Sequence, residues 1–175
     1  MTDIETLMLV QDPNTTAEVL DRLSADEDEF IRARVAAHLN TPSETLVKLS
    51  TDESGLVREF VAEHLSTPVE TLIALSEDEY IVSWVAGNPN TPIEILNKLS
   101  DHENEFVRIS ISVNPIIPVR ILEKLSKDED ENVRAAVAKN PKTPVAILSI
   151  LHKDSNESVR EVAAENPNTP GVNRA

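Results

Sequence analysis

Leucines recur along this chain in two columns, and the members of the second column lie three positions after those of the first. The columns are Leu20, Leu46, Leu72, Leu96, Leu122 and Leu148, and then Leu23, Leu49, Leu75, Leu99, Leu125 and Leu151. Residues three apart lie on the same face of an α-helix. The pattern therefore predicts a short amphipathic helix in every segment, with its leucines in the core.

A second apolar pattern follows each leucine pair, and it consists of a Val or Ile before an arginine, then an apolar and a small residue. The apolar positions are Val35, Val61, Val85, Ile111, Val137 and Ala163, and the small ones are Ala36, Ala62, Ala86, Ser112, Ala138 and Ala164. Asn88, Asn114, Asn140 and Asn166 follow, each before a proline that cannot continue a helix. This predicts a second helix, capped by asparagine and, in the first two copies, by His38 and His64.

The two helices belong to one repeating unit, which is marked by a Thr-Pro step. The second residue of that step falls at Thr16, Pro42, Pro68, Pro92, Pro118, Pro144 and Pro170, with spacings of 26, 26, 24, 26, 26 and 26. A period of this length is typical of stacked solenoids. We therefore predict an all-α protein, a right-handed α-solenoid of stacked short helix pairs with about six repeats of 24–26 residues.

The boundaries of the units come from helix-start signals. We expect Thr41 to be an N-cap, Pro42 the first helical residue and Glu44 the acid of a capping box. Residues 1–15 look like half a repeat that caps the stack, residues 16–166 hold the repeats, and residues 167–175 form a truncated last repeat or a tail. Residues 1–175 are predicted to form a single solenoid domain.

The repeat VRxxVAxNPxTPxxxLxxLxxD, clearest at residues 133–151 and 107–128, resembles the leucine-rich repeat variant family. The resemblance covers nearly the whole chain. It implies a right-handed superhelix of alternating α- and 3₁₀-helices, so one helix of each pair is either α or 3₁₀. A family member with an iron-sulfur cluster holds it in an added cysteine-rich segment, and this chain has no cysteine. The units are also similar to HEAT repeats, which are binding scaffolds.

The composition limits the classes of binding partner and the cellular compartment that we expect. Sixteen basic residues against 31 acidic ones leave a net charge of −15, which repels nucleic acid and anionic lipid and favours basic partners. The absence of cysteine excludes disulfides, thiolate metal sites and a cysteine nucleophile. The start, MTDIETLMLV, lacks the basic region of a signal peptide, and no apolar run reaches membrane-spanning length. We expect a soluble, cytoplasmic protein.

An arginine column recurs at Arg32, Arg58, Arg108, Arg134 and Arg160. An acid precedes most of its members by six residues, giving the pairs Asp26 with Arg32, Asp52 with Arg58, Asp128 with Arg134 and Asp154 with Arg160. Two units depart from this scheme, because His102 precedes Arg108 and Val82 follows Asp78 where an arginine would stand. Arginine matches a carboxylate well, and we interpret the column as a structural ion-pair ladder.

No pattern in the sequence points to catalysis. His38 and His64 lie one repeat apart, and capping explains them better than a shared metal. The acidic runs 26–29 and 128–131 lack the glycine and the bidentate acid of an EF-hand. With three glycines there is no phosphate loop, and no serine or threonine has a nucleophile motif. We expect no enzyme, no catalytic residue, no cofactor and no metal.

The second helices of the middle units carry apolar residues on the side that should be polar. At 100° per residue we place the columns of Ile31, Val35, Ala36 and Leu39 in the core, and those of Phe30, Ala33, Arg34 and Ala37 outside. The outer residues of the middle units are Leu56, Phe60, Tyr80, Trp84, Phe106, Ile109 and Val113. Such a patch is typical of a protein-binding surface. The alternative is that superhelical curvature buries it between repeats.

The sequence therefore predicts a non-catalytic scaffold that binds a protein or peptide through this patch and an acidic edge. The partner should carry basic residues around an apolar anchor, and neither nucleic acid nor a membrane should bind directly. One alternative is self-association, with the patch as the face of a homodimer in a structural protein. Another is an acidic decoy of nucleic acid that occupies the basic cleft of a DNA-binding protein.

Overall fold

The computed structural model describes residues 3–169, which form thirteen α-helices and no strand. The helices are α1 (Asp3–Gln11), α2 (Ala17–Leu23), α3 (Glu29–Ala37), α4 (Ser43–Leu49), α5 (Gly55–Glu63), α6 (Val69–Leu75), α7 (Val82–Gly87), α8 (Ile93–Leu99), α9 (Glu105–Val113), α10 (Val119–Leu125), α11 (Glu131–Lys139), α12 (Val145–Leu151) and α13 (Glu157–Glu165). Both helices of each described pair are α, so the 3₁₀ alternative is not found. The predicted all-helical repeat solenoid is confirmed.

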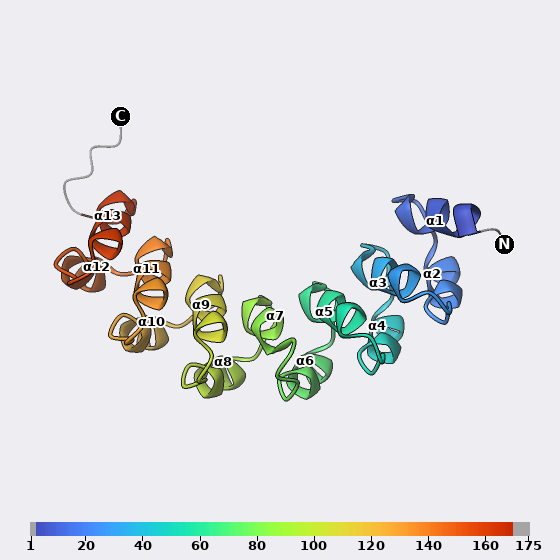
Figure 1. Cartoon of the computed structure of the whole chain (residues 1–175), viewed down its shortest axis with the longest axis horizontal. Coiled ribbons are helices and arrows are strands. Elements are labelled where there is room, and N and C mark those ends of the chain that lie inside the picture. The colour runs from blue at the N-terminus through green and yellow to red at the C-terminus, as the bar shows by residue number, and fades with distance from the viewer. Residues whose placement is uncertain (1–2, 170–175) are drawn as a thin grey trace. The chain divides into compact units, whose positions relative to one another are not determined.

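Two compact units divide the chain, Met1–Thr91 and Pro92–Ala175. In the first unit α1, α3, α5 and α7 form one row and α2, α4 and α6 the other (Figure 1). In the second unit α9, α11 and α13 form one row, and α8, α10 and α12 the other (Figure 1). The single-domain prediction stays a prediction, and most of the predicted tail at residues 167–175 lies outside the described residues.

The core of each unit is built as the leucine periodicity predicts. All twelve column leucines are buried, and so are the apolar positions of the second helices from Val35 to Ala163. The small residues that follow them let neighbouring second helices pack closely. None of the described helices has the length or the apolar run needed to cross a membrane.

Two positions of the second helix were placed on the wrong side by the helical-wheel argument. Leu39 is exposed, because His38 takes an extended conformation (φ −78, ψ 129) and ends the helical register before Leu39. Ala33 is buried, because α3 packs between α1 and α5 and its covered arc is wider than one stripe. Both errors come from assuming one uninterrupted helix with one buried face.

The predicted capping boxes are also wrong. Pro42, not Thr41, lies at the N-cap of α4, since its carbonyl accepts the first helical hydrogen bond from Leu46. The Thr41 hydroxyl donates to the carbonyl of Val35, at the end of the preceding helix. Side-chain caps occur instead on four second helices, at Asp28, Asn104, Asp130 and Asn156.

The unit shortened by two residues loses them from the first turn of its second helix. Helix α7 begins only at Val82, after Ile81 in a non-helical conformation (φ −120, ψ 1). Tyr80 therefore lies in a turn before α7 and not on its first turn. The turn is held by the backbone N–H groups of Ile81 and Val82, which both donate to the carbonyl of Asp78.

Candidate functional site

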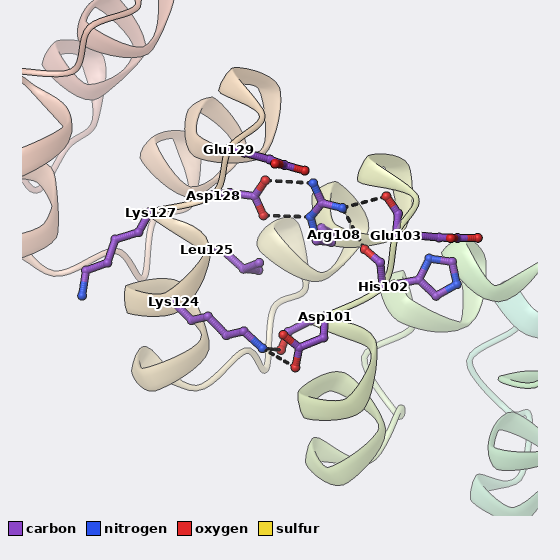
Figure 2. Close-up of a pocket in the computed structure, with 10 residues that line it drawn as sticks. Asp101, His102, Glu103, Arg108, Lys124, Leu125, Lys127, Asp128 and Glu129 are labelled. Carbon is purple, nitrogen blue, oxygen red and sulfur yellow. Dashed lines mark hydrogen bonds and ion pairs between the residues drawn. The ribbon is translucent and has the colours of Figure 1, made fainter.

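The arginine ladder is seen at its fullest around Arg108, which lines a polar hollow of about 490 Å³ (Figure 2). Nη1 of Arg108 donates to the carbonyls of His102 and Glu103, at 2.7 and 2.9 Å. Its Nε and Nη2 both donate to the Asp128 carboxylate at 2.8 Å. Both side chains of this pair are 8% exposed, so the guanidinium joins two successive repeats at the edge of the core.

The same geometry recurs in Arg32 with Asp52 and in Arg134 with Asp154. The predicted pairing within one repeat is therefore wrong. The residue six positions earlier contributes its backbone carbonyl, and the carboxylate comes from twenty residues later, in the next repeat. The Asp26 carboxylate accepts instead from the N–H of Asp28.

Burial and pairing act in opposite directions on the ladder acids. Burial raises the pKa of Asp128, but hydrogen bonds from Arg108 and from the N–H of Asp130 outweigh it, and the pKa lies below its usual 3.8. The pKa of Asp52 is lowered by the same balance. For Asp154 the hydrogen bond from Arg134 is the largest effect, and the pKa is again lowered. These acids are therefore held ionised, as a structural ion pair requires.

A second cation that lines the hollow beside Arg108 is also paired. Lys124 bonds the carboxylate of Asp101 at 2.6 Å and the hydroxyl of Ser100 at 2.8 Å, so its charge is matched like that of Arg108 (Figure 2). Within residues 3–169 no cluster of three or more His, Asp or Glu is arranged to hold a metal ion. The arrangement ties repeats together, which is the scaffold interpretation of the ladder.

Helix-ending asparagines form a second ladder between repeats. Asn166 donates from Nδ2 to the carbonyls of Ala138 and Asn140, and its Oδ1 accepts from the N–H of Asn168. His64 makes the contact within its own turn and one of the two contacts to the preceding repeat, since its Nδ1 accepts from the N–H of Ser66 and its Nε2 lies 3.1 Å from the carbonyl of His38. His38 does the same with Asn40 and Asp12. The predicted capping role of both histidines is confirmed.

The predicted outer patch divides into exposed and half-buried residues. Tyr80 is 85% exposed and Phe106 64%, and Val113 is also exposed. Leu56, Phe60, Trp84 and Ile109 are half-buried, and the first three of these pack against the core of the first unit. Three of the seven residues are thus exposed and none is fully buried, and the role of the patch in binding stays a prediction.

An apolar hollow in the first unit was missed by the sequence argument. Leu39 and Leu65, 85% and 65% exposed, line a hollow of about 290 Å³ together with the half-buried Phe60. A neighbouring hollow of about 380 Å³, which reaches Val10 of α1, shares Ala37 and Leu39 with it. The signal was present in the sequence, because the other repeats have proline where these two have leucine.

Acidic residues border this apolar hollow. Glu63 lines it and is exposed. One turn earlier on α5, Glu59 has a raised pKa, first because it is partly buried and second because Glu63 repels its charge. A cation brought next to this pair would relieve the repulsion. Arg34 lines the neighbouring hollow and not this one.

Among the solved structures similar to this chain is one described as a leucine-rich repeat variant with a novel repetitive protein structural motif. The two are 27% identical in sequence, with a TM-score of 0.68, and the match covers 91% of this chain and 65% of the other. The chain thus spans less than two thirds of the length of that structure. No family model matches the present chain, and no curated protein matches it either. The predicted resemblance to a leucine-rich repeat variant is confirmed.

Proposed function

Given this likeness to a leucine-rich repeat variant, we propose that the chain is a non-catalytic module that binds a basic protein segment through an apolar anchor. The observation that carries the proposal is the hollow between Leu39, Phe60 and Leu65. Leucines exposed to this degree contribute nothing to the core, and proline serves at the same position in other repeats. Their apolar side chains therefore need another explanation, and partner binding provides one.

The size of the hollow suits a side chain of a partner. About 290 Å³ is at the lower end for ligand pockets, which typically hold about 300–1,000 Å³, and it is open to solvent. The neighbouring hollow extends the surface by one repeat, across Ala37 toward Val10. A segment that places one large apolar residue on Phe60 and continues toward α1 would cover both hollows.

Charge selects the chemistry of that segment. The net charge of −15 attracts basic chains at long range, and Glu63 with Glu59 provides a local site for a lysine or arginine beside the apolar anchor. The exposed Tyr80, which also lies in the first unit, offers a further apolar contact for a longer partner. Such binding should weaken as salt concentration rises.

Selection from a library of random peptides tests the proposal. We expect selected peptides to combine Lys or Arg with a large apolar residue, and to bind with an affinity that falls as salt rises. The double variant Leu39→Pro, Leu65→Pro should weaken binding by about tenfold or more if the leucines are the anchor, since hot-spot truncation costs about 2 kcal/mol. Ile150→Ser is a matched control, because Ile150 is 59% exposed on α12, in the second unit.

Four outcomes would contradict the proposal. Selected peptides without basic residues would remove the charge argument. Unchanged binding by the double proline variant would move the site away from the hollow. A dimer in dilute solution that the same variant converts to monomer would make the hollow a self-association face, and selective capture of DNA-binding proteins at low salt only would favour the decoy alternative.

A further inference from the structure

The turn that follows each second helix is tied to the preceding repeat by its third residue where that residue is asparagine. The Nδ2 group of Asn40 donates to the carbonyl of Pro13 at 2.9 Å, and that of Asn90 donates to the carbonyl of Leu65 at 2.6 Å. Asn168 makes the same kind of bond in the second unit. In each case the acceptor is the second residue of the preceding turn, so an asparagine here satisfies one backbone carbonyl of the repeat before it.

The turn after α5 has Ser66 at this position, and the serine side chain has no amide to extend toward the preceding turn. The equivalent acceptor is the carbonyl of Leu39. Among the hydrogen bonds of residues 3–169 none reaches this carbonyl oxygen, and the neighbouring bond from His64 goes to the carbonyl of His38. Leu39 is exposed, so the chain leaves this acceptor to water or to a partner.

The open carbonyl belongs to a residue of the apolar hollow on which the proposed function depends. Leu39 and Ser66 both line that hollow, together with Phe60 and the exposed Glu63. An apolar surface, a backbone acceptor and a carboxylate therefore border one space of about 290 Å³. Both polar groups accept hydrogen bonds and neither donates, so a ligand that satisfies them must bring N–H donors together with positive charge.

The net charge of the chain is concentrated in the unit that holds this hollow. Residues 1–91 contain 18 acidic and 5 basic residues, a net charge of −13, whereas residues 92–175 contain 13 and 11, a net charge of −2. The long-range attraction of a basic segment is therefore directed to the first unit. A cation that reaches the hollow is favoured both by this field and by Glu63 beside it.

We propose that the hollow selects arginine over lysine in its partner, because the guanidinium donates to the Leu39 carbonyl in place of the absent amide and to the Glu63 carboxylate. The inference rests on the proposed function, since it concerns the same hollow. Arginine presents five N–H donors in a planar fork and can serve two acceptors at once, whereas the lysine ammonium is a compact, strongly hydrated charge. Arg108 already serves backbone carbonyls and a carboxylate together in this way.

Peptide binding to the wild-type chain and to Ser66→Asn tests the inference. The probe is the tightest peptide from the library selection, synthesised with arginine or with lysine at its basic positions. The arginine form should bind about fivefold more tightly to the wild-type chain, as expected for one net hydrogen bond. Ser66→Asn supplies the amide of the other repeats and should remove this preference. It should also raise the unfolding temperature by about 2–4 °C, because the Leu39 carbonyl then has a donor within the chain.

Two control variants separate this effect from crowding of the hollow. Ser66→Asp has the shape of asparagine but no N–H donor, so it should keep the preference for arginine even though its added charge strengthens the binding of both peptides. Ile116→Asn places the same amide at the same turn position in the second unit, and it should leave both affinities unchanged. Crowding would instead weaken the binding of both peptides in Ser66→Asn and in Ser66→Asp alike, and that result would overturn the inference.

The NMR signals of the carbonyl carbons give a readout at the acceptor itself. The Leu39 carbonyl signal of the full chain should move downfield as the arginine peptide is added, since the oxygen gains a hydrogen bond, and it should move less with the lysine peptide. The Leu65 carbonyl is the internal control, because Leu65 lines the same hollow but its carbonyl already accepts from Asn90. Its signal should move less than that of Leu39 with either peptide, and the reverse order would contradict the inference.

The outcomes separate the choice of arginine from the use of the hollow. If the double variant Leu39→Pro, Leu65→Pro weakens peptide binding while the arginine and lysine forms bind the wild-type chain equally, the hollow is the site and the arginine inference is overturned. An unchanged preference in Ser66→Asn would overturn it as well. If no peptide binds, or if the double variant binds as tightly as the wild-type chain, the proposed function fails and the inference fails with it.

Discussion

The turns that follow α3 and α5 differ from those that follow α11 and α13, although in both a buried side chain joins the turn to the preceding repeat. His38 and His64 stand where Asn140 and Asn166 stand in the later turns; each ring faces the carbonyl 26 residues earlier, and each amide donates to the carbonyl 28 residues earlier. The next residue is leucine in the first pair and proline in the second. The comparison teaches that the repeat keeps a buried polar contact to the preceding repeat while the next residue, which is exposed, varies between leucine and proline. The fold therefore does not require leucine at this position.

The ladder step next to the shortened unit differs from the complete steps. Arg58 makes a single carboxylate hydrogen bond to Asp78, with side chains 19% and 22% exposed, just before the shortened unit. Nε and Nη2 of Arg108 both donate to the Asp128 carboxylate, and both side chains are only 8% exposed. The shortened unit has Val82 where the next ladder arginine would stand, and the following loop has His102 where its aspartate would stand. The residue types change together, as pairing between successive repeats requires.

The largest effect should come from removing the best ladder step. Arg108→Ala leaves the buried Asp128 carboxylate and two carbonyls without their donor and should cost about 3–5 kcal/mol of unfolding free energy. Arg58→Ala, at the more exposed step, should cost about 1–2 kcal/mol. Urea unfolding of both variants measures the difference. Equal losses would mean that the two steps do not differ as their geometry indicates.

Acid should weaken the same ladder. The pKa values of Asp52, Asp128 and Asp154 are lowered in the folded chain, so their contribution to stability is complete above the usual carboxyl pKa of 3.8. It is lost as the pH falls from 3.8 through the lowered values, where the unfolded chain binds more protons. Unfolding free energies measured down this range should fall, and Asp128→Asn should reduce the slope. A flat profile would contradict the ionised ladder.

Substitutions in the asparagine ladder should have an intermediate effect on the unfolding free energy, and they test whether histidine can replace asparagine there. Asn140→Ala removes the donor to the Ser112 carbonyl and the acceptor for the Lys142 N–H, both at a buried site, and should cost about 2–3 kcal/mol. Asn140→His should cost about 1 kcal/mol or less, since histidine already serves at the equivalent position after α5. Thermal unfolding of both variants provides the measurement, and equal destabilisation would refute the equivalence of the two residues.

Within the predicted patch, Trp84 and Tyr80 should behave differently. Trp84 packs against the core, so Trp84→Ala should cost about 2–3 kcal/mol, below the usual range for fully buried aromatics. Tyr80→Ala should cost about 0.5 kcal/mol or less, because its side chain is exposed in a turn. Chemical unfolding measures both costs. A red-shifted, readily quenched Trp84 emission in the folded chain would contradict its packing.

The smallest effect concerns the exposed leucines. Leu39→Pro and Leu65→Pro should each change the unfolding free energy by about 0.5 kcal/mol or less, because the preceding His38 and His64 already have the extended backbone that proline favours. A large loss of stability in calorimetry would show that the two leucines stabilise the folded chain. Weaker peptide binding by the double proline variant would then reflect unfolding and not loss of a contact.

The sequence by itself determined the helix pairs, the repeat length and the core, because these depend on local periodicity. Leucines three apart must share a helix face, and an Asn-Pro step must end a helix wherever it occurs. The two columns from Leu20 to Leu151 and the caps at His38 and His64 were accordingly predicted correctly.

Only the tertiary structure decided which residues meet across repeats. Arg32 lies six residues from Asp26 and twenty from Asp52, and sequence distance favoured the wrong partner because stacking brings the next loop beside the guanidinium. The sequence argument assigned Thr41 to the start of α4, but its hydroxyl donates to the end of α3. It also placed Leu39 in the core, but Leu39 is exposed because the helix ends before His38. These outcomes depend on how one repeat packs on the next, and local periodicity contains no information on that packing.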